Sequence, residues 1–103
     1  MDLNRLKYRK MKEGFVYILT NMERTKLYIG VTSNLKRRIS EHKELIWGHT
    51  ALHRLTILVY YEEIFGMMKC IKREKQLKNW HKDWKWNLIK SMNPELKDLY
   101  YTL

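Results

Sequence analysis

The sequence is poor in residues that cross-link or interrupt a chain, with one cysteine, one proline and four glycines among 103 residues. Because Cys70 stands alone, an internal disulfide is excluded, and with it the class of small secreted domains held by disulfides. No linker or internal repeat divides the chain, and a second core would need roughly another 50 residues. We therefore expect one domain at residues 13–103, preceded by a basic N-terminal extension at residues 1–12.

Long apolar segments are also missing. No stretch approaches the ~20 apolar residues that a membrane-spanning helix needs, and the polar, basic start lacks the apolar run of a signal peptide. Together with the lone cysteine, this predicts a cytoplasmic protein with no membrane partner. The oligomeric state is not readable from the sequence, and we expect a monomer.

Acidic residues are few beside basic ones: eleven Asp and Glu stand against 21 Lys and Arg, which gives a formal charge of +10. Such a charge attracts polyanions, so nucleic acid is the first candidate partner. A basic surface that only keeps the protein soluble, or one that binds acidic lipid, would show the same excess of basic residues. Charge alone leaves these alternatives open.

Core-forming residues are plentiful, since 45% of the chain is hydrophobic. Short β-branched and aromatic runs at residues 15–20 and 27–32, joined by a polar segment, are typical of an antiparallel hairpin. Residues 55–62 form a third run of this kind, followed by an exit turn at Gly66. The direction in which the third strand pairs is not readable.

Helical spacing of apolar residues predicts three helices, at residues 34–46, 67–80 and 84–92. Thr32 or Ser33 can cap the first of them. The predicted fold is therefore α/β of the α+β kind, a small, mostly antiparallel three-stranded sheet flanked by helices in the order β-β-α-β-α-α.

The apolar stripe of the second predicted helix extends from Met67 to His81, and Glu74 interrupts it. Burying an unpaired carboxylate costs several kcal/mol, so a glutamate within an apolar stripe needs an explanation. One reading is a metal ligand. The other is a surface ion pair with Lys78, one turn further along the helix.

Four more polar side chains are predicted to lie against the sheet. Arg38 and His42, one helical turn apart, flank the apolar side of the first helix, although a solvated basic face would show the same spacing. Tyr17 and Tyr28 lie on the two hairpin strands, where tyrosine is common because it packs well on a pleated surface.

Lysines in the last two predicted helices advance by three or four residues and interleave with tryptophans. They predict a ridge that contacts phosphates, while the alternative is that the tryptophans pack inside and the lysines only solvate the surface. The candidate nucleic-acid-binding residues are Lys36, Arg37, Lys72, Lys75, Lys78, Lys82 and Lys85.

Several segments resemble, in order, the motifs of the GIY-YIG nuclease family. Residues 16–18 (VYI) and 28–30 (YIG) are similar to its paired strand motifs, and Arg38 stands ten residues after the second tyrosine, where the family has its arginine. Residues 73–78 resemble the helix with the metal-binding glutamate. Residues 93–99 resemble the closing segment of the small stand-alone bacterial members, the UPF0213-like proteins.

The resemblance implies one nuclease domain that hydrolyses phosphodiester bonds. It implies that Glu74 binds one divalent ion, Mg²⁺ or Mn²⁺, which prefers oxygen ligands, and that Arg38 grips the scissile phosphate. It permits Tyr17 or Tyr28 as the base that takes the proton of water, with His42 relaying or orienting. Between the two tyrosines we favour Tyr17.

The chain departs from the family pattern in three places. Phe15 stands where the first motif has glycine, which leaves the tyrosine hydroxyl unaffected. In the loop before the third strand, relatives often carry lysines and a tyrosine, whereas residues 50–53 (TALH) are expected to lack a phosphate contact. Leu96 replaces a common aromatic residue of the closing segment.

The leading hypothesis is a metal-dependent DNA endonuclease selective for structure or local context, suited to DNA repair or processing. A nucleic-acid-binding module for DNA or RNA, with the fold but without turnover, is the alternative. A structural or partner-binding protein is a third reading, which the basic charge disfavours.

Overall fold

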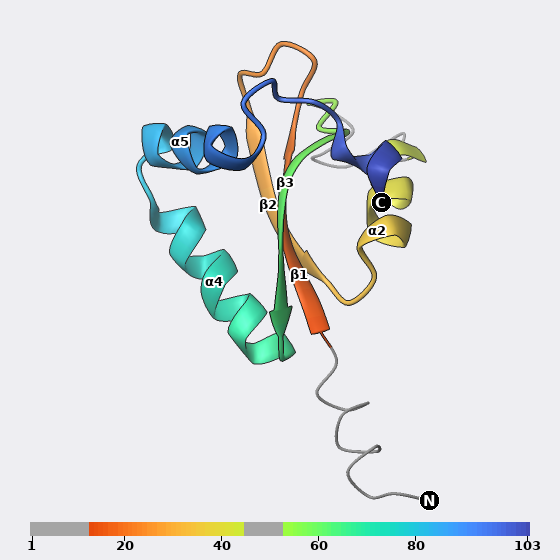
Figure 1. The fold of residues 1–103 in the computed structure, drawn as a ribbon, viewed down its shortest axis with the longest axis vertical. Coiled ribbons are helices and arrows are strands. Elements are labelled where there is room, and N and C mark those ends of the chain that lie inside the picture. The colour runs from red at the N-terminus through yellow and green to blue at the C-terminus, as the bar shows by residue number, and fades with distance from the viewer. Residues whose placement is uncertain (1–12, 45–52) are drawn as a thin grey trace, which may run out of the picture.

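The computed structural model describes residues 13–44 and 53–103. Within them β1 (Glu13–Thr20), β2 (Leu27–Thr32) and β3 (Ile57–Phe65) form one sheet in the order β2-β1-β3 (Figure 1). The central strand is antiparallel to both neighbours, which settles the direction of the third strand. The predicted α+β class and the order of its elements are confirmed.

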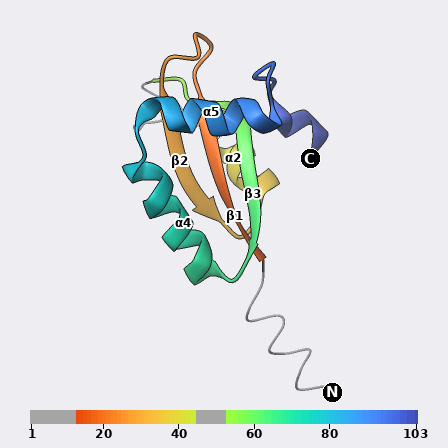
Figure 2. The ribbon, with the colours of Figure 1, turned by 60° about the vertical axis from the view of Figure 1, so that its left-hand side comes forward.

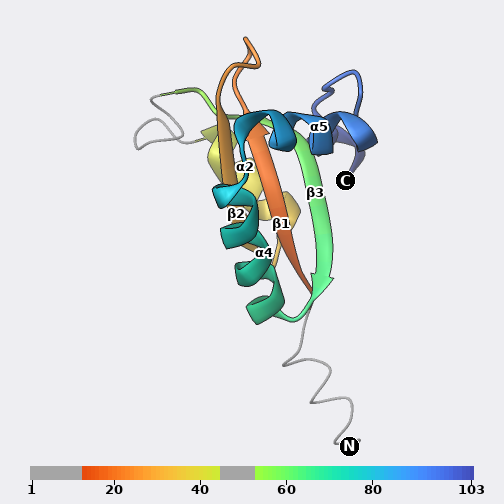
Figure 3. The same cartoon turned by 90° about the vertical axis from the view of Figure 1, so that its left-hand side faces the viewer.

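Helices cover both faces of the sheet. α4 (Met67–Asn79) and α5 (Lys82–Met92) lie on one face, while α2 (Leu35–Glu44) and the short 3₁₀ helix η1 (Leu99–Thr102) lie on the other (Figure 2 and Figure 3). Because the side chains of a strand alternate between faces, β1 contributes to two cores. Val16 and Ile18 belong to the core under α4 and α5, and Tyr17 belongs to the core under α2.

Several predicted boundaries were wrong by a few residues. β3 begins at Ile57, two residues later than predicted, and extends three residues further, to Phe65. α5 begins at Lys82, two residues before the predicted start, because His81 caps it: Nδ1 of His81 accepts from the amide of Asp83 at 3.3 Å. His81 is therefore exposed and outside the apolar stripe in which the spacing placed it.

The cap of α2 also differs from the prediction. The side chain of Asn34 accepts a hydrogen bond from the amide of Arg37 at 3.1 Å, as an N-cap residue does. Thr32 stabilises the turn before the helix instead of capping it, since its hydroxyl oxygen accepts a hydrogen bond from the amide of Asn34 at 3.1 Å. The helix thus begins at Leu35.

Two contacts fix α4 on the sheet. The guanidinium of Arg73 donates to both carboxylate oxygens of Glu62 on β3, with Nε 2.9 Å from Oε1 and one terminal nitrogen 2.8 Å from Oε2. Cys70 is fully buried and lies against Gly14, where an added Cβ would stand only 2.6 Å from its Sγ. The rotation of α4 about its axis is thereby determined.

Some predictions fall outside the part of the chain that the structure describes: the basic extension at residues 1–12, the end of the first helix at residue 46, and residues 50–52 of the loop before β3. Among the described helices, none combines the length and the apolar character that crossing a membrane requires.

Candidate active site

Three aromatic rings meet on the α2 side of the sheet. Tyr17 comes from β1, Tyr28 from β2 and His42 from α2, and the hydroxyl of Tyr17 lies 2.9 Å from Nε2 of His42. The ring centre of His42 is 5.7 Å from that of Tyr17 and 5.3 Å from that of Tyr28, both edge to face. The structure thus brings together three residues that the sequence proposed separately.

Arg38 completes this cluster. It lies one helical turn before His42, and its guanidinium is close enough to the hydroxyl of Tyr17 for their hydrogen bond to be the largest influence on the pKa of Arg38, which it raises. A terminal nitrogen also donates to Glu41 at 3.0 Å. Because the arginine is only partly exposed and always charged, it presents a fixed positive group beside the aromatic rings.

The cluster changes the acidity of its own members. Burial raises the pKa of Tyr17 to about 12, although the hydrogen bond with Arg38 acts in the opposite direction. Burial, followed by the charge of Arg38, lowers the pKa of His42 to about 4. At neutral pH the tyrosine is therefore a neutral phenol and the histidine a neutral imidazole, and a hydrogen bond joins the hydroxyl of Tyr17 to Nε2 of His42.

Gly30 makes room for this arrangement. It pairs with Tyr17 across the β1–β2 ladder, on the same face of the sheet. A Cβ at this position would stand 2.5 Å from both the Cζ and the hydroxyl oxygen of Tyr17. Any residue other than glycine would therefore displace the tyrosine hydroxyl from His42.

Glu74 lies apart from these four side chains. It is carried by α4, which packs on β1 and β2 from the opposite face of the sheet. Its side chain is 17% exposed, between the buried Cys70 and Leu77, and its Oε1 lies 3.1 Å from Nζ of Lys78. The ion pair weighed against the metal ligand is thus present, and within residues 13–44 and 53–103 the other carboxylate oxygen has no cationic partner.

Metal ligands are not clustered elsewhere in the described residues, where no group of three or more His, Cys, Asp or Glu side chains converges. Mg²⁺ needs few protein ligands, because it retains several waters and uses substrate oxygens. A largely buried carboxylate whose partner lysine is half exposed fits such an ion, since Lys78 can move away into solvent.

The basic residues named from the sequence lie on the surface but not on one continuous ridge. α4 ends at Asn79 and Trp80 is extended, so Lys82 and Lys85 belong to a second helix with its own direction. The two groups remain in contact, since Nζ of Lys85 donates to the carbonyl of Lys78 at 3.3 Å. Lys36, Arg37, Lys72 and Lys75 are exposed.

Two of the tryptophans pack against the core, and one is exposed to solvent. Trp80 and Trp86 pack partly buried against the core under α4 and α5. Trp84 is 60% exposed and meets Trp80 edge to face with ring centres 6.2 Å apart. Of the three tryptophans in the described C-terminal helices and their junction, Trp84 is the one exposed to a ligand.

A family profile described as the GIY-YIG catalytic domain matches residues 13–87, which include all five proposed catalytic residues. The chain belongs to the GIY-YIG family. This family consists of nucleases, whose substrates are nucleic acids, and the resemblance drawn from residues 16–18 and 28–30 is confirmed.

Two proteins similar to this GIY-YIG chain carry the same label. A UPF0213 protein of Syntrophus aciditrophicus is 37% identical over 87 residues, covering 82% of this chain and 98% of its own length. A UPF0213 protein of Desulfotalea psychrophila is 34% identical over 89 residues, covering 84% of this chain and 80% of its own. No solved structure matches the chain.

The sequence did not predict the contacts that hold the elements of the site in position. Neither the Arg73–Glu62 pair nor the steric role of Gly30 was proposed. A signal existed for Gly30, because a glycine inside a β-branched strand often marks a close approach of another group. No comparable signal pointed to Glu62, whose partner stands eleven residues away on another element.

Proposed function

We propose that this protein is a metal-dependent endonuclease that hydrolyses phosphodiester bonds in DNA, selecting its target by structure or local context, in DNA repair or processing. The observation that carries the proposal is the contact of Tyr17, Tyr28, Arg38 and His42 in one cluster. A binding module would have no need for a buried tyrosine–histidine hydrogen bond beside an arginine.

Arg38 is proposed to hold the scissile phosphate. Its planar guanidinium can donate two parallel hydrogen bonds to phosphoryl oxygens and offset the charge that develops on them during hydrolysis. The nearby hydroxyl of Tyr17 and the ion pair with Glu41 restrain the arginine before substrate arrives. The phosphate is thereby placed over the aromatic rings.

Burial favours Tyr28 over Tyr17 as the residue that meets the attacking water, which reverses the preference expressed from the sequence. Tyr17 is 1% exposed and its hydroxyl is already hydrogen-bonded to His42, whereas Tyr28 is only partly buried. We assign Tyr17 to positioning: it orients His42 and Arg38 around Tyr28.

His42 is proposed to receive a proton once substrate is bound. The positive charge of Arg38 contributes to its low pKa, and a phosphate bound to Arg38 would counter that charge. The imidazole would then become a better proton acceptor when it is needed.

Glu74 is proposed to hold one Mg²⁺ or Mn²⁺. Such an ion polarises a phosphoryl oxygen and acidifies a bound water. Because Glu74 and Arg38 approach from opposite faces, a substrate served by both must pass the outer edge of β2, which is the edge strand next to α4. This requirement favours an extended polynucleotide over a small phosphate ester.

Two variants test the metal assignment. Glu74→Ala should abolish cleavage of plasmid DNA in Mg²⁺ or Mn²⁺ while leaving DNA binding largely intact. Lys78→Met breaks the same ion pair but retains the carboxylate, so it should cleave normally at saturating DNA. Equal loss in both variants would mean that the pair with Lys78 is the only role of Glu74, and undiminished cleavage by Glu74→Ala would remove it from the site.

A second function is favoured by one observation. The separation of Glu74 from the four-residue cluster by the sheet is what a binding module that has lost turnover would show. Plasmid, branched DNA and single-stranded RNA, each incubated with Mg²⁺, Mn²⁺ or chelator, separate the two functions. Binding without nicking of any substrate at high protein concentration would support the module.

A further inference from the structure

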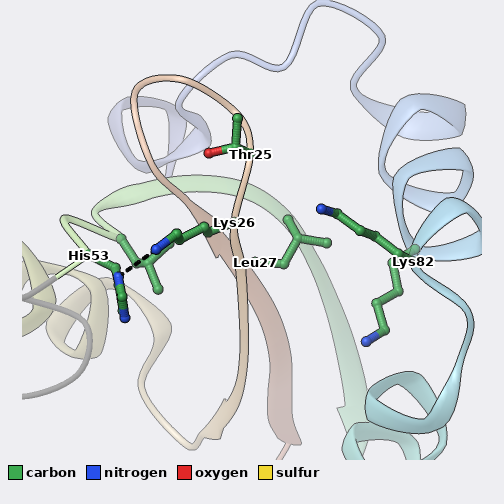
Figure 4. Close-up of a pocket in the computed structure, with 7 residues that line it drawn as sticks. Thr25, Lys26, Leu27, His53 and Lys82 are labelled. Atoms are coloured by element: carbon green, nitrogen blue, oxygen red, sulfur yellow. Dashed lines mark hydrogen bonds between the residues drawn. The ribbon is translucent and has the colours of Figure 1, made fainter.

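A basic pocket of about 370 Å³ opens where β2 begins. Lys26 and His53 line one side of it and Lys82 of α5 the other, with Leu27 between them (Figure 4). Lys85 and Leu55 also line the pocket, and none of the described lining residues is acidic. The residues come from three segments that are far apart in the sequence.

Two of the three lysines of this pocket have a hydrogen-bond partner. Nζ of Lys26 lies 2.8 Å from Nδ1 of His53, and since an ammonium can only donate, the imidazole accepts and is neutral in this arrangement. Lys85 is anchored by its bond to the carbonyl of Lys78. Lys82 forms no ion pair within the described residues.

The charge of this pocket favours an anionic ligand. Three ammonium groups around one cavity repel each other, and an anion between them would remove that cost. Lysine binds phosphate as a point charge, while the partly buried Leu27 offers an apolar wall of the kind that a sugar or base covers. The chemistry that matches both is a nucleotide phosphate.

The pocket also lies beside the candidate active site. Leu27 immediately precedes Tyr28 on the edge strand, and neighbouring residues of a strand point to opposite faces. Leu55 packs in the core of Tyr17, whereas Leu27 packs in the core under α4. The pocket therefore reaches both faces at the edge of β2, along which an extended substrate must pass.

We propose that Lys26, Lys82 and Lys85 bind a backbone phosphate of the substrate strand that flanks the scissile phosphate. This inference rests on the proposed function. It adds Lys26 and His53, which the sequence did not suggest, and separates Lys82 and Lys85 from the lysines of α4. The pocket sets the register of the strand over Tyr28 and Arg38.

Binding is measured by fluorescence anisotropy with duplex DNA in chelator, so that the result is independent of cleavage. The double variant Lys26→Gln/Lys82→Gln should bind about tenfold more weakly at moderate salt and lower the slope of log K against log salt by about one. The matched control Lys69→Gln/Lys90→Gln removes two exposed lysines of α4 and α5 outside the pocket and should change affinity much less. Equal effects in both would overturn the proposal.

A scan with single neutral methylphosphonate linkages identifies the phosphate. In the wild-type protein one flanking position should weaken binding, and in Lys26→Gln/Lys82→Gln the same position should have no further effect. Should AMP compete at the pocket while all linkages behave alike, a free nucleotide is the ligand and the proposal fails. If the double variant does not fold, Lys82→Gln alone carries the test.

The outcomes separate this inference from the endonuclease proposal. Position-specific coupling in chelator, together with no cleavage under any condition, would support the phosphate pocket and remove the enzyme. Cleavage without such coupling would retain the enzyme and remove the pocket.

Discussion

Nζ of Lys43 lies 2.6 Å from Oδ2 of Asp98, and this ion pair joins the helix that carries Arg38 and His42 to the C-terminal segment. The other oxygen of Asp98 accepts from the amide of Leu58 on β3 at 3.1 Å. A single carboxylate thus connects α2, the sheet and the segment that precedes η1. Both partners of the pair are about four-fifths buried, with 21% and 20% of their side chains exposed.

Replacing Asp98 should therefore destabilise the protein. Asp98→Asn retains an oxygen that can accept from the backbone but leaves the ammonium of Lys43 without its counter-charge, so we expect the free energy of unfolding to fall by about 2 kcal/mol in urea titrations. Glu95→Gln is the control, because it breaks the well-exposed pair with Lys97 and should cost less than about 0.5 kcal/mol. Equal losses would contradict the structural role of Asp98.

Gly30→Ala should impair cleavage more than stability. The added methyl would push the ring of Tyr17, which is buried and bonded to His42 and cannot simply swing away. We expect a loss of stability of about 1–3 kcal/mol from overpacking and a loss of cleavage rate of about a hundredfold from the displaced hydroxyl.

Gly14→Ala is the matched control for that experiment. It places the same methyl group on β1, the strand that pairs with the strand of Gly30, but against Sγ of Cys70 on the other face of the sheet. Its cost in stability should be similar, while its cleavage rate, measured at a temperature where both variants are folded, should remain near that of the wild type. A comparable loss of cleavage would show that the site responds to general strain.

His42 should make stability depend on pH. Its pKa is about 4 in the folded protein and near its ordinary value of 6.5 when unfolded, so on acidification the unfolded chain binds the proton first. The free energy of unfolding should fall between pH 6.5 and 4, by up to about 3 kcal/mol. His42→Gln removes this contribution, and a difference from wild type that stays constant over this range in urea titrations would contradict the assignment.

The sequence was sufficient for the two hairpin strands and for the family, whereas the site residues drawn from it stay predictions. Alternating and β-branched runs at residues 15–20 and 27–32 predict a hairpin by local physics, and its pairing places Tyr17 opposite Gly30. The turn-to-turn spacing of Arg38 and His42 allowed both to face the sheet, but a solvated basic face has the same spacing. These features depend on neighbours in the sequence or on one helical period.

What the sequence could not provide depends on contacts between distant segments. The pairs Lys43–Asp98 and Arg73–Glu62 leave no periodic trace, since charged residues at those positions are equally suited to solvent. The cap of α2 was assigned to Thr32 or Ser33 because three polar residues compete there, and the geometry of the turn selects Asn34. The opposition of Tyr17 and Glu74 across the sheet required the position of α4 in space.

Cys70 has a practical consequence for the study of this molecule. It is the only cysteine of the chain, it is fully buried, and burial raises the pKa of its thiol, so it should react slowly with maleimides. A cysteine introduced at the exposed position of Lys69 or Lys90 would therefore be the single fast-reacting thiol. Fluorophores or spin labels could then be attached at one chosen point on a helix without first removing the native residue.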